Sequence, residues 1–278
     1  MRALLVTITT AVMVMSASLW IPQAAALPVA PEPVAPVTGI PTPCPVTHAW
    51  PGDDAPLATI TAALTKNFGF KLIGSQWTEA SRASIKILWQ TLDAVDCTGY
   101  VTALQAKVNG NVGINAATIS GFAWGDWSLT KPNYVTMDFS KFQRALDSGD
   151  EGRLVRLVTH EMAHVLNSDR FEDPAYWKTF TQLYAEQGRF SEYASSSVTE
   201  TFADVVGYYV GRCALENPYD TGEHDAYYEF ARTYVFGGKE FGPAPGEKPN
   251  CTVPAPGAET PLPGKPTPQS WVEAVSGE

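Results

Sequence analysis

The acidity of this 278-residue chain, with a formal net charge of −10 at pH 7, makes nucleic acid and anionic membrane surfaces poor candidates for its partners. The sequence contains no nucleotide-binding glycine loop and no internal repeat. Setting aside two proline-rich ends leaves about 200 residues, enough for one domain with a sizeable core. We predict that this domain spans residues 46–241 and that the Pro/Gly-rich residues 242–278 form a tail.

The first residues are typical of a secretory signal peptide, which we predict over residues 1–26. Arg2 precedes an apolar run that threonines and serines dilute, and the run ends at Ala24-Ala25-Ala26. This composition favours cleavage after Ala26 over an uncleaved membrane helix. Residues 27–45 are rich in proline and are predicted to form an extended lead-in. We therefore expect a secreted, extracellular protein, either free or associated with the cell wall.

The first half of the domain is predicted to contain helices and short strands. Helical periodicity indicates helices over residues 57–66 and 79–95, the second with Thr78 as its N-cap. Residues 111–129 mix valine, isoleucine, glycine and tryptophan in alternation and are typical of short strands and turns. Residues 134–139 alternate as a strand does. The expected fold class is α+β, mostly helical, with a small sheet beside the helix that follows.

The most informative motif is the sequence HEMAH at residues 160–164. Residues four apart share one face of a helix, so His160 and His164 can bind the same metal ion. Glu161 points to the adjoining side, where it suits a general base acting on water. The alternative is a surface helix that carries two histidines by coincidence. Against it, an apolar stripe around the histidines turns this face toward the interior. The stripe consists of Leu154, Leu157, Val158 and Val165.

Two further helices are predicted after this motif. Residues 173–174 are Asp-Pro and begin a helix whose aromatic residues we interpret as core packing. A second, strongly apolar helix begins near Ser197 and carries Glu200 and Asp204 four positions apart. Glu200 is the candidate third metal ligand, and Asp204 can accept the free ring N–H of a ligating histidine. The alternatives are that Glu200 completes a capping box begun at Ser197 and that Asp204 belongs to an exposed acid pair.

With these residues in place, the sequence resembles the gluzincin zinc metallopeptidases. Within them it is most similar to the branch that contains the anthrax lethal factor catalytic domain and the secreted Pro-Pro endopeptidases. The segment ETFAD at residues 200–204 begins 36 residues after His164, and Tyr193 stands seven residues before Glu200. Where the branch often has a glutamate, this chain has Asp204. The likeness covers residues 134–214.

The resemblance implies a zincin-like metallopeptidase fold with one Zn²⁺ per chain. Its ligands would be His160, His164 and Glu200, with Glu161 as general base and Tyr193 as a neutral O–H donor to the oxyanion. In the resembled branch, the strand before the histidine helix is an edge strand that binds substrate as an added β-strand. An ordinary core strand is the alternative for residues 134–139.

The remaining histidines and the cysteines carry less information. His224 is a second candidate oxyanion donor, but its turn-like acidic surroundings favour a solvated loop histidine; His48 is given no role. Four cysteines without C-x-x-C spacing in an exported protein predict two disulfides, and three pairings are open. The pairing that is most local in the chain joins Cys44 to Cys97 and Cys213 to Cys251.

The sequence therefore predicts an exported zinc-dependent endopeptidase that acts as a monomer on a peptide or protein substrate. One rival is a catalytically idle relative that keeps zinc as a structural or partner-binding element. Glu161 argues against it, because a structural site needs no base and uses four protein ligands. The other rival is a surface-associated binding protein whose proline-rich tails make the contacts.

Overall fold

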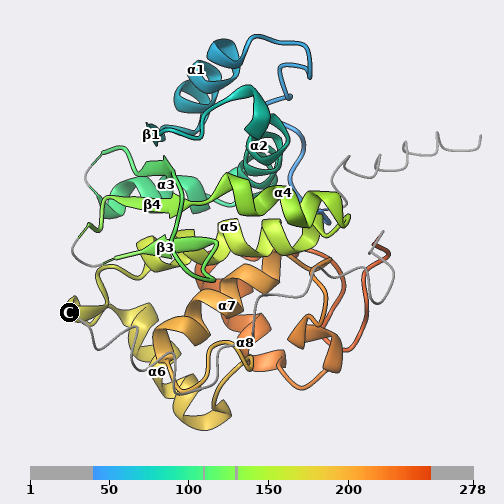
Figure 1. Cartoon of the computed structure of the whole chain (residues 1–278). Coiled ribbons are helices and arrows are strands. Elements are labelled where there is room, and N and C mark those ends of the chain that lie inside the picture. Colours follow the sequence, from blue (N-terminus) through green and yellow to red (C-terminus); the bar gives the residue numbers. More distant parts are fainter. Residues whose placement is uncertain (1–39, 109, 129–130, 252–278) are drawn as a thin grey trace, which may run out of the picture. The chain divides into compact units, whose positions relative to one another are not determined.

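The computed structural model describes residues 40–108, 110–128 and 131–251. The signal peptide predicted over residues 1–26 lies outside the described residues, as does the tail after Cys251. About half of the described chain is helical and four strands form one mixed sheet, so the predicted α+β class is confirmed (Figure 1). The larger elements, in chain order, are α1 (Leu57–Phe68), β1 (Lys71–Gly74), α2 (Arg82–Asp96), α3 (Tyr100–Lys107), β2 (Gly113–Ala116), β3 (Gly125–Trp127), β4 (Tyr134–Met137), α4 (Phe139–Asp147), α5 (Glu151–Leu166), α6 (Ala175–Gln187), α7 (Val198–Val210) and α8 (Asp225–Phe230).

The four strands run in the order β1-β2-β4-β3. The first three are parallel and β3 is antiparallel to β4, with Trp127 opposite Val135. Since side chains alternate along a strand, one face carries the buried Ile114, Val135 and Met137. Of the two alternatives for residues 134–139, the edge strand is wrong and the core strand is confirmed, because β4 lies between β2 and β3. The edge strand beside α5 is β3, and Phe139 already begins α4.

The predicted helices are present, with shifts at their ends. The helix expected over residues 79–95 begins at Arg82, because a 3₁₀ turn at Glu79–Ser81 precedes it. Thr78 stands before that turn and its side chain makes no capping hydrogen bond. The helix expected after residues 173–174 is α6. Helices α3, α4 and α8 were not predicted.

Helix α5 lies between the sheet side of the domain and α7 (Figure 1). The two helices approach closely at Gly207, where a Cβ atom would stand 2.9 Å from the Arg156 carbonyl oxygen and 3.1 Å from the His160 Cβ. A larger residue at position 207 would therefore push α7 away from the histidines. None of the helices in the described ranges is long and apolar enough to cross a membrane.

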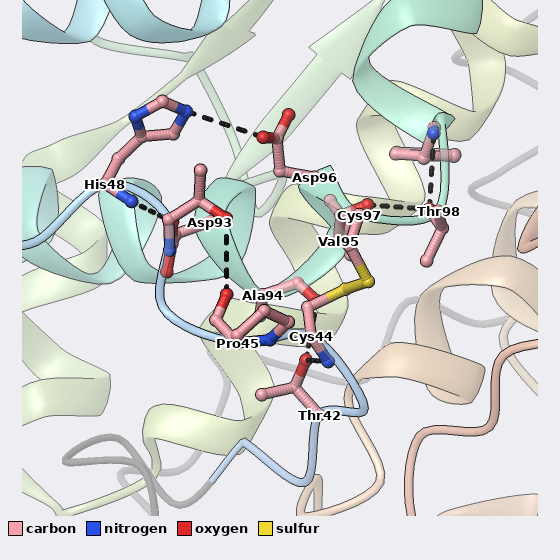
Figure 2. Close-up of a disulfide and its surroundings, with 12 residues drawn as sticks. Thr42, Cys44, Pro45, His48, Asp93, Ala94, Val95, Asp96, Cys97 and Thr98 are labelled. Carbon is pink, nitrogen blue, oxygen red and sulfur yellow. Dashed lines mark hydrogen bonds and ion pairs between the residues drawn. A yellow bond between two sulfur atoms is a disulfide. The ribbon is translucent and has the colours of Figure 1, made fainter.

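Two disulfides join the ends of the described chain to the helices, and they have the chain-local pairing. Cys44 bonds to Cys97 at the end of α2, and Cys213 bonds to Cys251. Around the first disulfide, the Asp93 carboxylate accepts hydrogen bonds from two backbone N–H groups of the incoming segment, at 2.7 and 3.1 Å (Figure 2). These contacts and the disulfide fix the segment from Cys44 to His48 against α2.

Candidate metal centre

The histidine helix is well defined by its sequence. Asp150 precedes α5, and its carboxylate accepts a hydrogen bond from the backbone N–H of Arg153 at 3.2 Å. The apolar face of the helix then packs into the core and takes the motif with it. His160, Glu161 and His164 are between 2% and 8% exposed. Buried imidazoles need polar partners, and theirs come from α7.

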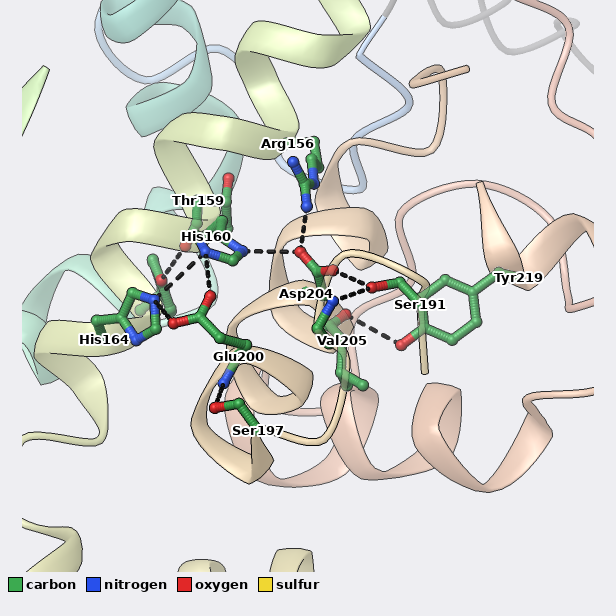
Figure 3. Close-up of polar contacts among 12 residues, drawn as sticks. Arg156, Thr159, His160, His164, Ser191, Ser197, Glu200, Asp204, Val205 and Tyr219 are labelled. Atoms are coloured by element: carbon green, nitrogen blue, oxygen red, sulfur yellow. Dashed lines mark hydrogen bonds and ion pairs between the residues drawn. The ribbon is translucent and has the colours of Figure 1, made fainter. Parts of the chain in front are cut away.

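Glu200 supplies the nearest of these partners. The Ser197 hydroxyl accepts a hydrogen bond from the backbone N–H of Glu200 at 3.2 Å and so starts α7. The carboxylate of Glu200 points toward both histidines (Figure 3). Its Oε2 lies 3.3 Å from His160 Nε2 and its Oε1 lies 3.5 Å from His164 Nε2. The two Nε2 atoms are 3.3 Å apart. His160, His164 and Glu200 could therefore hold a metal ion.

The charged groups around the two histidines and Glu200 favour a positive charge between them. Burial opposes protonation of His160, but hydrogen bonds to Asp204 and Glu200 outweigh it and raise its pKa to about 10. In the same way, burial acts to raise the pKa of Glu200, yet the two histidines hold it far below its usual range. A cation bound between the imidazoles and the carboxylate would meet the same attraction.

Asp204 connects the second ring nitrogen of His160 to α7. Its Oδ1 lies 2.8 Å from His160 Nδ1, and it also accepts hydrogen bonds from Arg156 and from the Ser191 hydroxyl (Figure 3). Asp204 is fully buried, and although burial acts to raise its pKa, Arg156 and His160 hold the pKa below the usual range. If a metal ion displaces the Nε2 proton of His160, the ionised Asp204 keeps the remaining proton on Nδ1 and leaves Nε2 as the ligand atom.

Glu161 lies beside the three candidate ligands and against the edge strand. Burial raises the pKa of its carboxyl group. Gly125 of β3 faces it so closely that a Cβ atom there would overlap the Glu161 side chain. Two positions on, the Trp127 ring stacks on the His164 ring with centroids 6.0 Å apart and planes 12° from parallel. The edge strand thus forms one wall of the site.

A buried lysine holds the loop that leads into this strand. Lys141 of α4 donates hydrogen bonds from Nζ to the carbonyl oxygens of Ile119, Gly121 and Ala123 at 2.6 to 2.9 Å. Asp138 accepts a hydrogen bond from the Ile119 backbone N–H at 3.0 Å. Since β3 follows directly, these contacts determine where the strand meets α5.

Tyr193 lies next to His160 but remains 45% exposed. The two ring centroids are 5.7 Å apart, and the guanidinium carbon of Arg156 lies 5.2 Å from the Tyr193 ring centre. Partial burial and the carboxylates of Glu200 and Glu161 raise the pKa of Tyr193 above its ordinary value. Its hydroxyl therefore stays protonated at neutral pH.

The structure brings together more residues than the sequence indicated. Arg156 stands four positions before His160, so helical spacing alone could have placed it on the same face. Ser191, Gly125 and Trp127 come from other segments, and no sequence spacing connects them to the motif.

The two remaining histidines are not part of the candidate metal group. His224 packs against Phe190 with ring centroids 4.8 Å apart, and burial lowers its pKa. His48 Nε2 lies 3.4 Å from Asp96 Oδ2 near the first disulfide (Figure 2).

Two imidazoles and one carboxylate can thus hold a metal ion, and Glu161 lies beside them without being one of the three. Three protein ligands leave one position of a four-coordinate ion open to a small molecule. No protein-family model, curated protein or solved structure matches this chain.

Proposed function

We propose that this protein is an exported zinc-dependent endopeptidase that hydrolyses peptide bonds, with Glu161 as general base. The observation that carries the proposal is the convergence of His160, His164 and Glu200 with a fourth acid, Glu161, beside them. A structural metal site has no use for that acid. A hydrolytic site needs it to accept a proton from the attacking water.

The spacing of the three ligands supports zinc as the metal. Zinc bonds to imidazole nitrogen and carboxylate oxygen are about 2.0–2.2 Å long, so ligand atoms at the corners of a tetrahedron lie roughly 3.3–3.5 Å apart. The two Nε2 atoms are 3.3 Å apart, and each of them has a different oxygen of the Glu200 carboxylate at 3.3 or 3.5 Å, so each of these pairs fits that spacing. Two neutral nitrogens and one carboxylate are also a donor set that catalytic zinc accepts.

Zinc at this position would acidify a water molecule and polarise the carbonyl of the scissile peptide bond. The carboxylate of Glu161 would take the proton from the attacking water and pass it to the leaving amine. Tyr193 would donate its hydroxyl hydrogen to the developing oxyanion. Asp204 would keep the His160 ring in the orientation and tautomer that a ligand needs.

The edge strand gives the substrate a place to bind. β3 pairs with β4 on one side and is the last strand of the sheet, so its other edge can pair with an extended peptide. Gly125 brings that strand into contact with Glu161. A peptide added there would run past the general base. A small sheet, a histidine helix and a glutamate helix in this order support a zincin-like fold, and the two disulfides are compatible with an extracellular location.

The test is turnover of a mixed peptide library by the zinc-loaded protein, with Glu161→Gln as the matched variant. Gln keeps the shape of the side chain but cannot accept a proton, so we expect full zinc content and a loss of nearly all cleavage. Zinc content is measured by atomic emission and cleavage by mass spectrometry. Equal cleavage by both proteins would remove Glu161 as the base. Zinc binding without cleavage by the wild type would instead favour the catalytically idle alternative.

A further inference from the structure

Arg170 lies next to the candidate metal site, directly after the histidine helix. It begins a 3₁₀ turn, Arg170–Glu172, and its guanidinium carbon lies 5.7 Å from the ring centre of Trp127 and 4.5 Å from that of Phe171. Trp127 is the residue that stacks on His164. The guanidinium is therefore only two ring contacts away from a candidate metal ligand.

The charge of Arg170 has no carboxylate partner in the part of the chain that the structure describes. Its Nη1 donates a hydrogen bond to the Asn167 carbonyl oxygen at 3.3 Å, and no ion pair of the described ranges includes it. The acids that flank the turn are engaged elsewhere. Asp169 pairs with Lys107, and Asp173 pairs with Lys178 at 3.0 Å. A half-buried cation without an ion-pair partner among the described residues is thus left beside the site.

Among the described residues, the guanidinium donates a hydrogen bond only from Nη1, so its other donors remain for a ligand. Stacking on an aromatic ring uses the face of the planar group, while its N–H donors lie in the plane and match the two oxygens of a carboxylate. The ring centre of Phe171, a residue that is 75% exposed, lies 4.5 Å from the guanidinium carbon. Partial exclusion of water strengthens a charged hydrogen bond at this position.

From this arrangement we propose that Arg170 binds a carboxylate side chain of the peptide substrate, as a specificity-determining residue of the site. The inference rests on the proposed peptidase function. An extended peptide advances about 3.3 Å per residue, so the guanidinium is within reach of a residue no more than about four positions from the scissile bond. The substrate class is therefore a peptide with a glutamate or aspartate close to the cleaved bond.

The first experiment compares kcat/KM of the zinc-loaded protein for peptide pairs that differ only by Glu or Gln. The substitution is placed at each of the four positions on either side of the cleaved bond, in peptides with amidated C-termini. At one position we expect the Glu peptide to be cleaved about tenfold faster, because a charge-assisted pair is worth about one factor of ten. Arg170→Gln should bring that ratio to about one, and Arg170→Glu should favour a Lys peptide at the same position.

Two controls separate this role from a structural one. Arg232→Gln removes the same charge from a partly exposed arginine that pairs with Glu229, and it should leave the Glu/Gln ratio unchanged. Peptides with a free C-terminus and no acidic side chain test whether a terminal carboxylate takes the same place. A Glu/Gln ratio near one in the wild type, or an equal ratio in the wild type and Arg170→Gln, would overturn the proposal.

A binding measurement distinguishes failure of this proposal from failure of the peptidase function. Calorimetry on the zinc-loaded Glu161→Gln variant gives the dissociation constants of the same peptide pair without turnover. We expect about tenfold tighter binding of the Glu peptide, lost when Arg170→Gln is added. If the wild type cleaves nothing but this difference is present, the carboxylate subsite stands and the peptidase function falls. If the two peptides bind equally, the subsite is refuted.

Discussion

Replacing Asp204 by asparagine should weaken zinc binding and destabilise the protein through two separable contacts. Asn keeps the size of the side chain but loses its charge. One oxygen of Asp204 contacts both His160 Nδ1, at 2.8 Å, and Arg156, whose side chain is only 14% exposed. Loss of an outer partner of a ligating histidine lowers metal affinity by about tenfold to a hundredfold. Leaving a buried arginine without its partner costs about 3–5 kcal/mol of unfolding free energy.

The chain offers a matched control in a second buried arginine pair. Asp220 Oδ1 lies 3.2 Å from Arg212, whose side chain is fully buried, and this pair has no contact with the candidate metal ligands. Asp220→Asn should therefore cost stability of the same order while zinc affinity stays at the wild-type value. Urea unfolding of the metal-free proteins measures the first quantity, and competition with a chelator of known zinc affinity measures the second.

The two measurements decide whether Asp204 supports zinc binding by orienting His160 or only by stabilising the protein. If Asp204→Asn binds zinc as tightly as the wild type, the contact with His160 does not orient a ligand. If both variants lose zinc equally, the loss follows from general destabilisation. Only a loss confined to Asp204→Asn supports the role assigned to this carboxylate.

Three further variants test how the site is held in place. Gly125→Ala should displace the Glu161 carboxylate and lower kcat by at least about tenfold, with zinc content unchanged. Gly110→Ala is the control, because a Cβ atom at Gly110 has open space and should have no effect on kcat. Equal kcat values in the two variants would refute the role of the close approach between Gly125 and Glu161. Lys141→Met removes a cation bound to three carbonyl oxygens and should lower the unfolding free energy by at least about 2 kcal/mol in urea. Burial acts to raise the pKa of Asp138, but hydrogen bonds to its carboxylate lower it overall. The stability that the Asp138 carboxylate contributes is therefore complete above the pKa of about 3.9 that it has in the unfolded chain. This stability is lost as the pH falls through the lower pKa that Asp138 has in the folded protein. Asp138→Asn should therefore flatten the decline of the unfolding free energy below about pH 4.

The local parts of the site could be predicted from the sequence because helical spacing is a local property. His160 and His164 share a face of α5 whatever the rest of the fold does, and a cap at Ser197 places Glu200 in the first turn of α7. The disulfides also followed the shortest sequence separations. What could not be predicted depends on contacts between distant segments.

The sheet illustrates that limit. Residues 134–137 and 125–127 both alternate or contain strand-forming residues, and nothing in either segment states which of them lies at the edge. The position of β4 inside the sheet depends on its parallel pairing with β2, more than 20 residues earlier in the chain. The contact of Gly125 with Glu161 follows from that order. Similarly, Thr78 has a favourable type for an N-cap, but the chain forms a 3₁₀ turn first and α2 begins at Arg82.

The surroundings of the two glutamates separate their chemistry. Both lie beside the same pair of histidines, yet the pKa of Glu200 is held far below its usual range and that of Glu161 is raised. Glu200 faces both Nε2 atoms from α7, while Glu161 is enclosed by α5 and the backbone of β3 at Gly125. A carboxylate that stays ionised suits a metal ligand, and one that protonates more readily suits a group that accepts a proton and returns it. Burial and partners thus support the proposed assignment of Glu200 as ligand and Glu161 as base, in addition to the motif.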